Sequence, residues 1–235
     1  MLRIGLIGGM SWESSIEYYR IINQLVQKEL GGVHSAKIVM ISLDFAEIEE
    51  MQNRGDWDLA TQILVDSAKA IEGAGADFVL ICTNTMHLMA EEVQQGIGIP
   101  LLHIADATAK EIQNQHLSTV ALLGTRFTME KDFYKGRLEN KHGLNVLIPD
   151  QKQREKVHRV IYDELVKGVI LDESRLAYNT IIQNLVENGA EGIILGCTEI
   201  GLLVQEEDIP VPVFDTMEIH ALAAVDAALG LYELS

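Results

Sequence analysis

Residues Gly192–Ile200 read GIILGCTEI, so that a cysteine, Cys197, follows directly after a short apolar run that ends in a glycine. Such a run is typical of a parallel strand covered on both faces, and the residues after it indicate the start of a helix. In open α/β sheets, ligands bind outside the carboxyl ends of the strands, where N–H groups of the next helix face the opening. A thiol at that point is presented to a substrate, whereas a free cysteine elsewhere is more often an inert buried side chain.

A similar unit occurs earlier, where residues Phe78–His87 read FVLICTNTMH, and it belongs to a longer internal repeat. Strands are expected at residues 2–7, 37–43, 77–81 and 99–104, and again at 120–125, 144–148, 193–196 and 209–215. Because strands and helices alternate in each half, each half is expected to form a doubly wound parallel sheet. The sequence therefore predicts an α/β fold of two pseudo-symmetric lobes, residues 1–104 plus 216–235 and residues 105–215, with the active site in the cleft between them.

Composition narrows the class of protein. The 235 residues carry a net charge of −17, which argues against nucleic acid or an anionic membrane surface as a partner. Two cysteines make no disulfide framework, and reduced thiols suit a reducing compartment. The opening MLRIGLIGG reads as a first strand and not as a signal peptide, and no apolar stretch approaches the ~18 residues of a membrane span. We therefore expect a cytoplasmic protein.

Local signals set the expected helix boundaries. Ser11 and Ser14 are both available as N-caps of the first helix, and Ser14 with Glu17 fits a capping box. A short helix after Asp44 is expected to give way to a loop that carries Gln52, Asn53 and Arg54. Asp106 is expected to cap the helix that follows the fourth strand.

Aligning the two halves on strand length places Thr83 opposite Cys197, and Cys82 opposite Gly196. Two proton-handling groups on opposite sides of a small molecule are what inversion at a carbon requires, because one removes a proton and the other delivers one to the opposite face. A thiol near its ordinary pKa of ~8.5 serves as base or as acid. The developing carbanion needs hydrogen-bond donors around the substrate carboxylate, and Asn84, Thr85, Thr125 and Thr198 are suitable.

Four motifs distributed along the chain point to one family. They are IGGMS (residues 7–11), Thr83-Asn84-Thr85 with His87, LGT (residues 123–125) and GCTE (residues 196–199). Together with the duplication, they make the whole chain resemble the aspartate/glutamate racemase family, most of all its bacterial branch of broad or acidic amino-acid racemases. The resemblance implies two-lobed, usually dimeric proteins that racemise acidic amino acids with two cysteines and without pyridoxal phosphate or metal. It thus implies no cofactor, a homodimer, and an acidic amino acid as ligand.

The chain departs from the family pattern at its first motif. The family has Cys-Asn-Thr, whereas here Thr83 occupies the cysteine's place and Cys82 lies one residue earlier. Adjacent residues at a strand end point to different sides, so Cys82 is not expected to take the missing role. A threonine hydroxyl donates or relays a proton but is a poor base near neutral pH. Cys197 and Thr83 are therefore the expected catalytic pair, with unequal turnover in the two directions.

Further substrate contacts are expected from the family resemblance and from charge. Gln52 and Arg54 lie where family members contact the distal end of the substrate, and Lys167 resembles a position that pairs with its side-chain carboxylate. A solvated surface charge is the alternative for Arg54 and Lys167. Met10, on the first glycine turn, is expected to line the pocket. Glu199 is either a substrate contact or a helix N-terminal residue favoured by the dipole.

The same residues also bear on dinucleotide binding, metal binding and other reactions. The first glycine turn is not the dinucleotide fingerprint, and Cys82 with His87 has neither the spacing nor the partners of a zinc site, so no metal is expected. Within the superfamily, hydantoin racemisation or decarboxylation of a malonate remains an alternative. A binding protein that retained the pocket and lost turnover is the alternative from another class, because the first family cysteine is missing.

Overall fold

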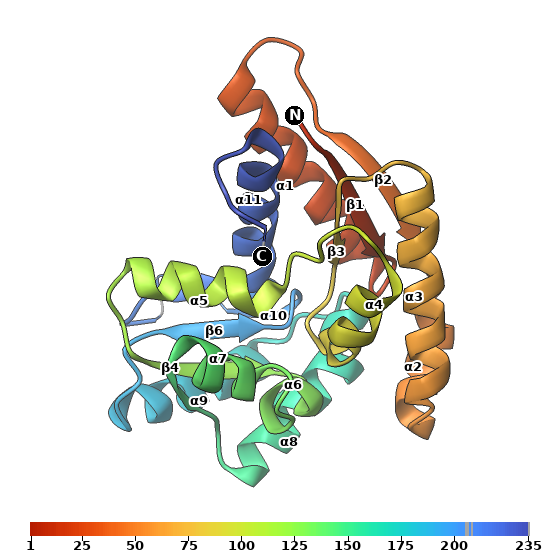
Figure 1. Ribbon diagram of the computed structural model, residues 1–235. Helices are drawn as coiled ribbons and strands as arrows, with labels where there is room; N and C mark the ends of the chain where they lie inside the picture. Colours follow the sequence, from red (N-terminus) through yellow and green to blue (C-terminus); the bar gives the residue numbers. More distant parts are fainter. Residues whose placement is uncertain (205–206, 208, 235) are drawn as a thin grey trace. The chain divides into compact units, whose positions relative to one another are not determined.

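The structure, a computed structural model, describes residues 1–204, 207 and 209–234. Its chain forms two compact units: Met1–Ile104 with His220–Ser235, and Ala105–Ile219. Each unit contains one parallel β-sheet with helices around it (Figure 1). The α/β class and the two lobes expected from the sequence are confirmed.

The first sheet has the strand order β2-β1-β3, with all strands parallel. Its strands are β1 (Arg3–Gly8), β2 (Lys37–Ser42) and β3 (Phe78–Ile81). The expected fourth strand at residues 99–104 does not form, because only Leu101 makes a bridge, to Val79. Pro100 has no N–H to donate, and the helix α5 (Ile104–Asn114) already begins at Ile104, so the segment is too short for a strand.

The second sheet has the order β5-β4-β6-β7, again parallel throughout. Its strands are β4 (Thr119–Gly124), β5 (Asn145–Leu147), β6 (Ile193–Gly196) and β7 (Val213–Asp215). The order matches that of the first sheet, with β7 in the place of the Leu101 bridge. The duplication read from the sequence is therefore a duplication of strand order.

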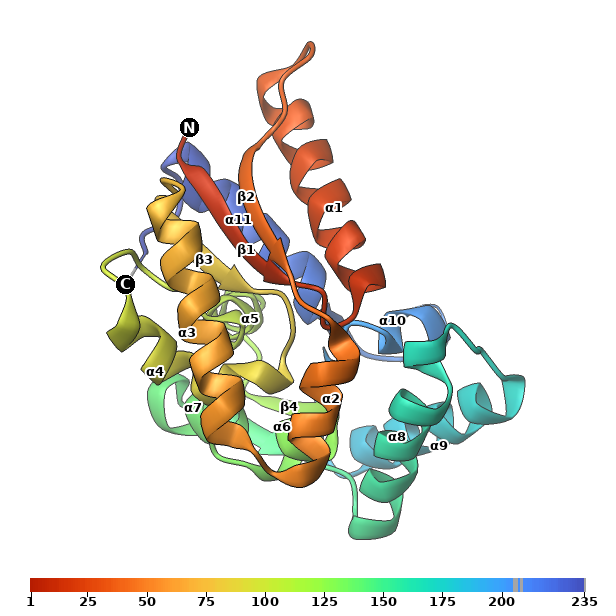
Figure 2. The same ribbon diagram turned by 90° about the vertical axis from the view of Figure 1, so that its right-hand side faces the viewer.

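Helices cover both faces of the first sheet. They are α1 (Trp12–Leu30), α2 (Phe45–Arg54), α3 (Trp57–Gly73), the 3-10 helix η1 (Thr85–Met89), α4 (Ala90–Gly96) and the later part of α11 (Thr216–Leu229). Figure 2 shows α3 on one side of the strands, with α1 and α11 on the other. The core on the α3 side contains Ile7, Val79 and Ile81 from the strands, with Leu64 and Ile71 from α3. Burial of these apolar side chains, three from the strands and two from α3, holds the helix against the sheet.

The second unit is built in the same way around its own sheet. Its remaining helices are α6 (Arg126–Glu130), α7 (Lys135–His142), α8 (Gln151–Asp163), the 3-10 helix η2 (Leu165–Lys167), α9 (Asp172–Glu187) and α10 (Ile200–Leu203). In the described part of the chain, no helix combines the length and the apolar character needed to span a membrane.

Three local predictions had to be corrected in whole or in part. Of the two N-cap candidates, Ser11 caps α1, with its Oγ accepting the Ser14 N–H at 3.4 Å, so the capping box predicted at Ser14 was wrong. Gln52 lies on α2 and not in a loop, because α2 continues to Arg54 and ends at the left-handed Gly55. Asp106 lies in the first turn of α5, after the helix has begun at Ile104, and not at the cap position before it.

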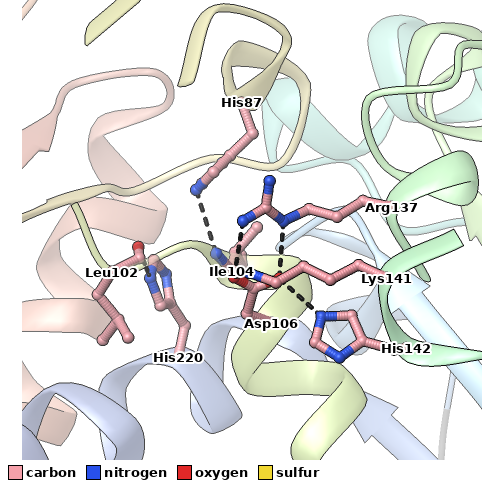
Figure 3. A network of polar contacts seen from close by, with 8 residues as sticks. All are labelled: His87, Leu102, Ile104, Asp106, Arg137, Lys141, His142 and His220. Carbon is pink, nitrogen blue, oxygen red and sulfur yellow. Dashed lines mark hydrogen bonds and ion pairs between the residues drawn. The ribbon is translucent and has the colours of Figure 1, made fainter. Parts of the chain in front are cut away.

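The carboxylate of Asp106 is occupied by side chains that are distant in the sequence. It accepts two hydrogen bonds from the Arg137 guanidinium, both 2.7 Å, and further ones from Lys141 and His142, both 2.8 Å (Figure 3). All three partners lie on α7, so that this cluster joins α5 to α7.

Candidate active site

The two sheets present equivalent positions at their strand ends. In the first unit Ile7 pairs with Ile81, and the ladder continues with the Cys82 N–H donating to the Ile7 carbonyl at 2.9 Å. In the second unit the last residue of β4, Gly124, pairs with Gly196. Matching the last residues of β1 and β4 places Cys82 with Gly196 and Thr83 with Cys197, the alignment expected from the sequence.

Glycines allow the strands of the second unit to come close together at this end. A Cβ on Gly124 would lie 2.8 Å from the carbonyl oxygen of Gly196, and a Cβ on Gly196 would lie 2.9 Å from that of Leu123. Real Cβ atoms do not approach so closely, so neither position tolerates alanine without a backbone shift. The glycines therefore fix the backbone from which Cys197 emerges.

At the first strand end, Thr83 is partly exposed and Cys82 is buried. The side chain of Cys82 is 1 % exposed, and burial raises the pKa of its thiol. Thr83, the next residue, is partly exposed, while Asn84 and Thr85 behind it are buried. The expectation that Cys82 points away from the accessible side therefore agrees with its burial.

A histidine that we did not assign a role from sequence holds this turn. The ring of His87 is 1 % exposed, and its Nδ1 lies 2.8 Å from the carbonyl oxygen of Thr83. The only sequence signal for this contact is the spacing of four residues between Thr83 and His87. That spacing brings the two together because the chain turns into η1 at Thr85.

At the second strand end, Cys197 is hydrogen-bonded to a carboxylate. Its Sγ–H donates to Glu199 Oε2 at 3.0 Å, and the Thr198 hydroxyl donates to the same oxygen at 2.8 Å. All three side chains are buried, with Cys197 9 % exposed. Burial is the largest cause of a strongly raised thiol pKa, and the negative charges of Glu199 and Asp215 raise it further.

This arrangement gives Cys197 a defined chemistry. With its pKa raised, the thiol keeps its proton at neutral pH, and a thiolate formed there is a strong base. Glu199 is the group positioned to receive the thiol proton, since it already accepts the hydrogen bond. Asp215, at the end of β7, is a second nearby charge that sequence reasoning missed because it lies on another strand.

Three of the expected substrate contacts already have structural roles. The Thr125 side chain caps α6 by accepting the Thr128 N–H at 3.3 Å. Met10 is buried in the apolar core of the first unit. Gln52 is buried and donates through Nε2 to the sulfur of Met86 at 3.1 Å, which brings α2 against the turn after Thr83.

The two expected cations differ in their surroundings. Lys167 is exposed at the end of η2, and η2 packs against α10, the helix directly after Glu199. Arg54 is exposed and forms an ion pair with Glu50 one turn earlier on α2. The element that carries Lys167 therefore packs against the helix that follows Cys197, whereas Arg54 forms a surface ion pair.

Metal binding has no evident location. Within residues 1–204, 207 and 209–234, no group of three or more His, Cys, Asp or Glu side chains is arranged to hold a metal ion.

Comparison with known proteins gives a consistent result. The model of the Asp/Glu/Hydantoin racemase family matches residues 7–224. A broad-specificity amino-acid racemase, RacX of Bacillus subtilis (strain 168), is 25% identical over 228 residues, which cover 97% of this chain and 98% of RacX.

Solved structures agree in fold along the whole chain. A Yersinia pestis protein suggested to be an Asp/Glu racemase is 55% identical, with a TM-score of 0.92 over 97% of this chain and 100% of that one. An aspartate racemase homologue from Pyrococcus horikoshii OT3 is 35% identical, with a TM-score of 0.84 over 97% of this chain and 100% of that one.

Proposed function

The chain belongs to the Asp/Glu/Hydantoin racemase family, and on that premise we propose that it racemises aspartate and glutamate without a cofactor. The observation that carries the proposal is the Cys197–Glu199 hydrogen bond at the end of β6. A buried thiol that is already bonded to a proton acceptor supports α-proton abstraction by the thiolate.

On one face of the substrate, Cys197 acts first as a base. The thiol proton moves to Glu199, and the resulting thiolate takes the α-proton, so that the C–H electron pair remains on the substrate as a carbanion. Because burial and two nearby carboxylates raise the pKa of this thiol, its thiolate is more basic than an ordinary one. Glu199 thus assists the base, a role that its contact supports better than direct substrate binding.

On the other face, Thr83 delivers a proton. Its hydroxyl gives the proton to the carbanion and takes one from water, because an alkoxide is far too basic to persist. Glu199 releases the proton that it received, which neutralises the resulting hydroxide through solvent and closes the cycle. The partial exposure of Thr83 supports this role, and the burial of Cys82 argues against a thiol in the same place. Since threonine is a poor base, we expect the two enantiomers to turn over at unequal rates at saturating substrate.

Further residues are proposed to bind the substrate. The polar ones are Asn84, Thr85 and Gln52 in the first unit and Thr125, Thr198 and Lys167 in the second, and Met10 is proposed as an apolar part of the pocket lining. Lys167 is assigned to the side-chain carboxylate, because it is an exposed cation on an element packed against α10. In a protein of net charge −17, an acidic substrate requires such a local cation.

The experiment is proton NMR of L- and D-aspartate and of L- and D-glutamate in D₂O, with wild type beside Cys197→Ala. We expect loss of the α-proton signal and appearance of the opposite enantiomer with wild type only. Exchange that is unchanged in Cys197→Ala would refute the assignment of Cys197. Exchange with none of the four would refute the substrate class.

Two alternatives follow from the same residues. The family description includes hydantoin racemases, so a hydantoin, or a malonate that loses carbon dioxide, is a second substrate class. These compounds are tested in the same assay. A protein that binds aspartate in calorimetry but exchanges no α-proton would instead be a binding protein.

We also propose that the enzyme is a homodimer that works in a reducing cytoplasm. Trp12, Ile16 and Tyr19 are exposed on one face of α1, an apolar surface that a second copy would cover. The two free cysteines fit a reducing compartment. Sedimentation of wild type beside Ile16→Glu tests the dimer, which the charge is expected to dissociate.

A further inference from the structure

The turn that carries Thr83 is tied to a distant segment by one buried imidazole. His87 lies in η1, and its two ring nitrogens contact two different backbone groups. Nδ1 lies 2.8 Å from the Thr83 carbonyl oxygen, and Nε2 lies 3.2 Å from the Ile104 nitrogen. Figure 3 shows the contact between His87 and Ile104.

The two contacts determine the tautomer of His87. The Ile104 N–H is a donor, so Nε2 must accept and carry no proton. The Thr83 carbonyl only accepts, so Nδ1 must carry the proton and donate it. The ring is therefore neutral, and both of its nitrogens are used by the backbone, so His87 is not itself available for proton transfer to a substrate.

A second histidine fixes the same distant segment. The Tyr18 hydroxyl donates to His220 Nδ1 at 2.9 Å, and His220 Nε2–H donates to the Leu102 carbonyl at 2.9 Å. Burial, followed by the nearby His87, lowers the pKa of His220 to about 3, so this ring is neutral as well. Leu102 and Ile104 are thus anchored by two neutral rings, and the segment is a firm support for His87.

We propose that His87 is a positioning residue for Thr83, an inference that rests on the proposed racemisation. By donating to the Thr83 carbonyl, His87 fixes the backbone of the turn and hence the rotamers open to the Thr83 hydroxyl. The bond to Ile104 orients the ring that makes this donation, as an outer hydrogen-bond partner orients a functional histidine. His87 therefore orients the Thr83 hydroxyl toward the carbon that receives the proton.

Two substitutions separate the bonds of His87. In His87→Asn, the amide nitrogen is attached to Cγ, as Nδ1 is, so it retains donation to Thr83 and loses Ile104. In His87→Gln, the amide oxygen lies one bond further out, as Nε2 does, so it retains acceptance from Ile104 and loses Thr83. Because the two variants are close in size and polarity, each is the matched control of the other.

The kinetic readout is inversion compared with exchange on the Cys197 face. We expect His87→Gln to lower kcat for inversion by about 10- to 100-fold with little change in KM, the cost of a misplaced catalytic group. His87→Asn is expected to invert much as wild type does. Exchange without inversion, which depends on Cys197, is expected to persist in both variants and shows that each is folded.

Two results would overturn the proposal: inversion by His87→Gln at the wild-type rate, or an equal loss of inversion in both variants. Adding His87→Gln to Thr83→Ala is expected to cause no further loss, because Thr83 is the group through which His87 acts; an additional loss of inversion in that double variant would likewise contradict the proposal.

A readout without catalysis separates this proposal from the proposed function. If wild type exchanges no acidic amino acid, the proposed function fails, and the methyl resonance of Thr83 decides the role of His87. A shift of that resonance in His87→Gln but not in His87→Asn supports positioning. A resonance that is unmoved in His87→Gln overturns it.

Discussion

The two strand ends occupy the same place in the two sheets, yet they carry different proton chemistry. Cys197 follows β6 with its thiol bonded to Glu199, whereas Thr83 follows β3 with its carbonyl opposite a neutral His87. One end has a titratable group with a proton acceptor, and the other has a hydroxyl fixed by its backbone. Duplication supplies equivalent positions, and in the proposed mechanism the neighbouring side chains determine that Cys197 serves as the base and Thr83 as the proton donor.

The largest expected effect distinguishes the two cysteines. Cys197→Ala is expected to lower racemisation and α-proton exchange at least ~10³-fold, since it removes the base. Cys82→Ala, the matched control, is expected to retain activity, because that thiol is fully buried and its pKa is raised. NMR exchange rates at saturating substrate measure both. Equal losses would place the base on the wrong strand end.

The next effect separates exchange from inversion. Thr83→Ala is expected to reduce inversion by about 10²-fold or more, while exchange on the Cys197 face continues, because Thr83 serves only as donor. Thr83→Cys is the contrasting variant, and a thiol there is expected to bring the two enantiomers closer in rate. Chiral chromatography beside NMR gives both quantities. Inversion that survives in Thr83→Ala would contradict the assignment.

Glu199→Gln tests the carboxylate beside the thiol. We expect kcat to fall by about 10²-fold, since the acceptor for the thiol proton is lost. Removal of the negative charge is also expected to lower the thiol pKa, so the pH profile of alkylation of Cys197 moves to lower pH. Glu173→Gln, an exposed substitution on α9, is the control. An unmoved alkylation profile would mean that Glu199 does not act on Cys197.

The smallest effect concerns His220, the buried histidine whose Nε2–H donates to the Leu102 carbonyl. Its pKa is lowered from 6.5 to about 3, so the unfolded chain binds a proton at His220 that the folded chain does not. Stability therefore falls as pH drops below 6.5, by about 2 kcal/mol between roughly pH 7 and pH 5 from this residue.

Urea unfolding at several pH values measures the effect. His220→Gln is expected to remove this part of the pH dependence, and His34→Gln, which is exposed, is expected to retain it. Equal slopes in wild type and His220→Gln would rule out His220 as the cause.

Much of the fold was predictable because it depends on local patterns. The apolar run at 193–196 coincides with β6, and equal strand lengths align Thr83 in the first half of the sequence with Cys197 in the second. Because adjacent residues at a strand end point to different sides, the sequence also predicted different surroundings for Cys82 and Thr83, and the burial of Cys82 agrees with this. Strand periodicity and glycine turns are short-range signals, so a single sequence carries them.

The remaining features depend on contacts that sequence distance hides. Asp106 resembled a helix cap but is bound by side chains on α7, some thirty residues away. Residues 99–104 resembled a strand, yet Pro100 and the early start of α5 leave only a bridge. The same limitation concealed the bond between His87 and Ile104, since neither residue signals the other.

If the two proposed catalytic ends are chemically unequal, the unmodified enzyme must treat the two enantiomers of its substrate differently. The measurement is the initial rate of α-proton loss in D₂O, for each enantiomer of aspartate and of glutamate separately, at saturation. One enantiomer, the one whose α-proton faces Cys197 in the proposed mechanism, is expected to exchange much faster than its mirror image. Equal rates for the two enantiomers would contradict this expectation, because both strand ends would then act as bases.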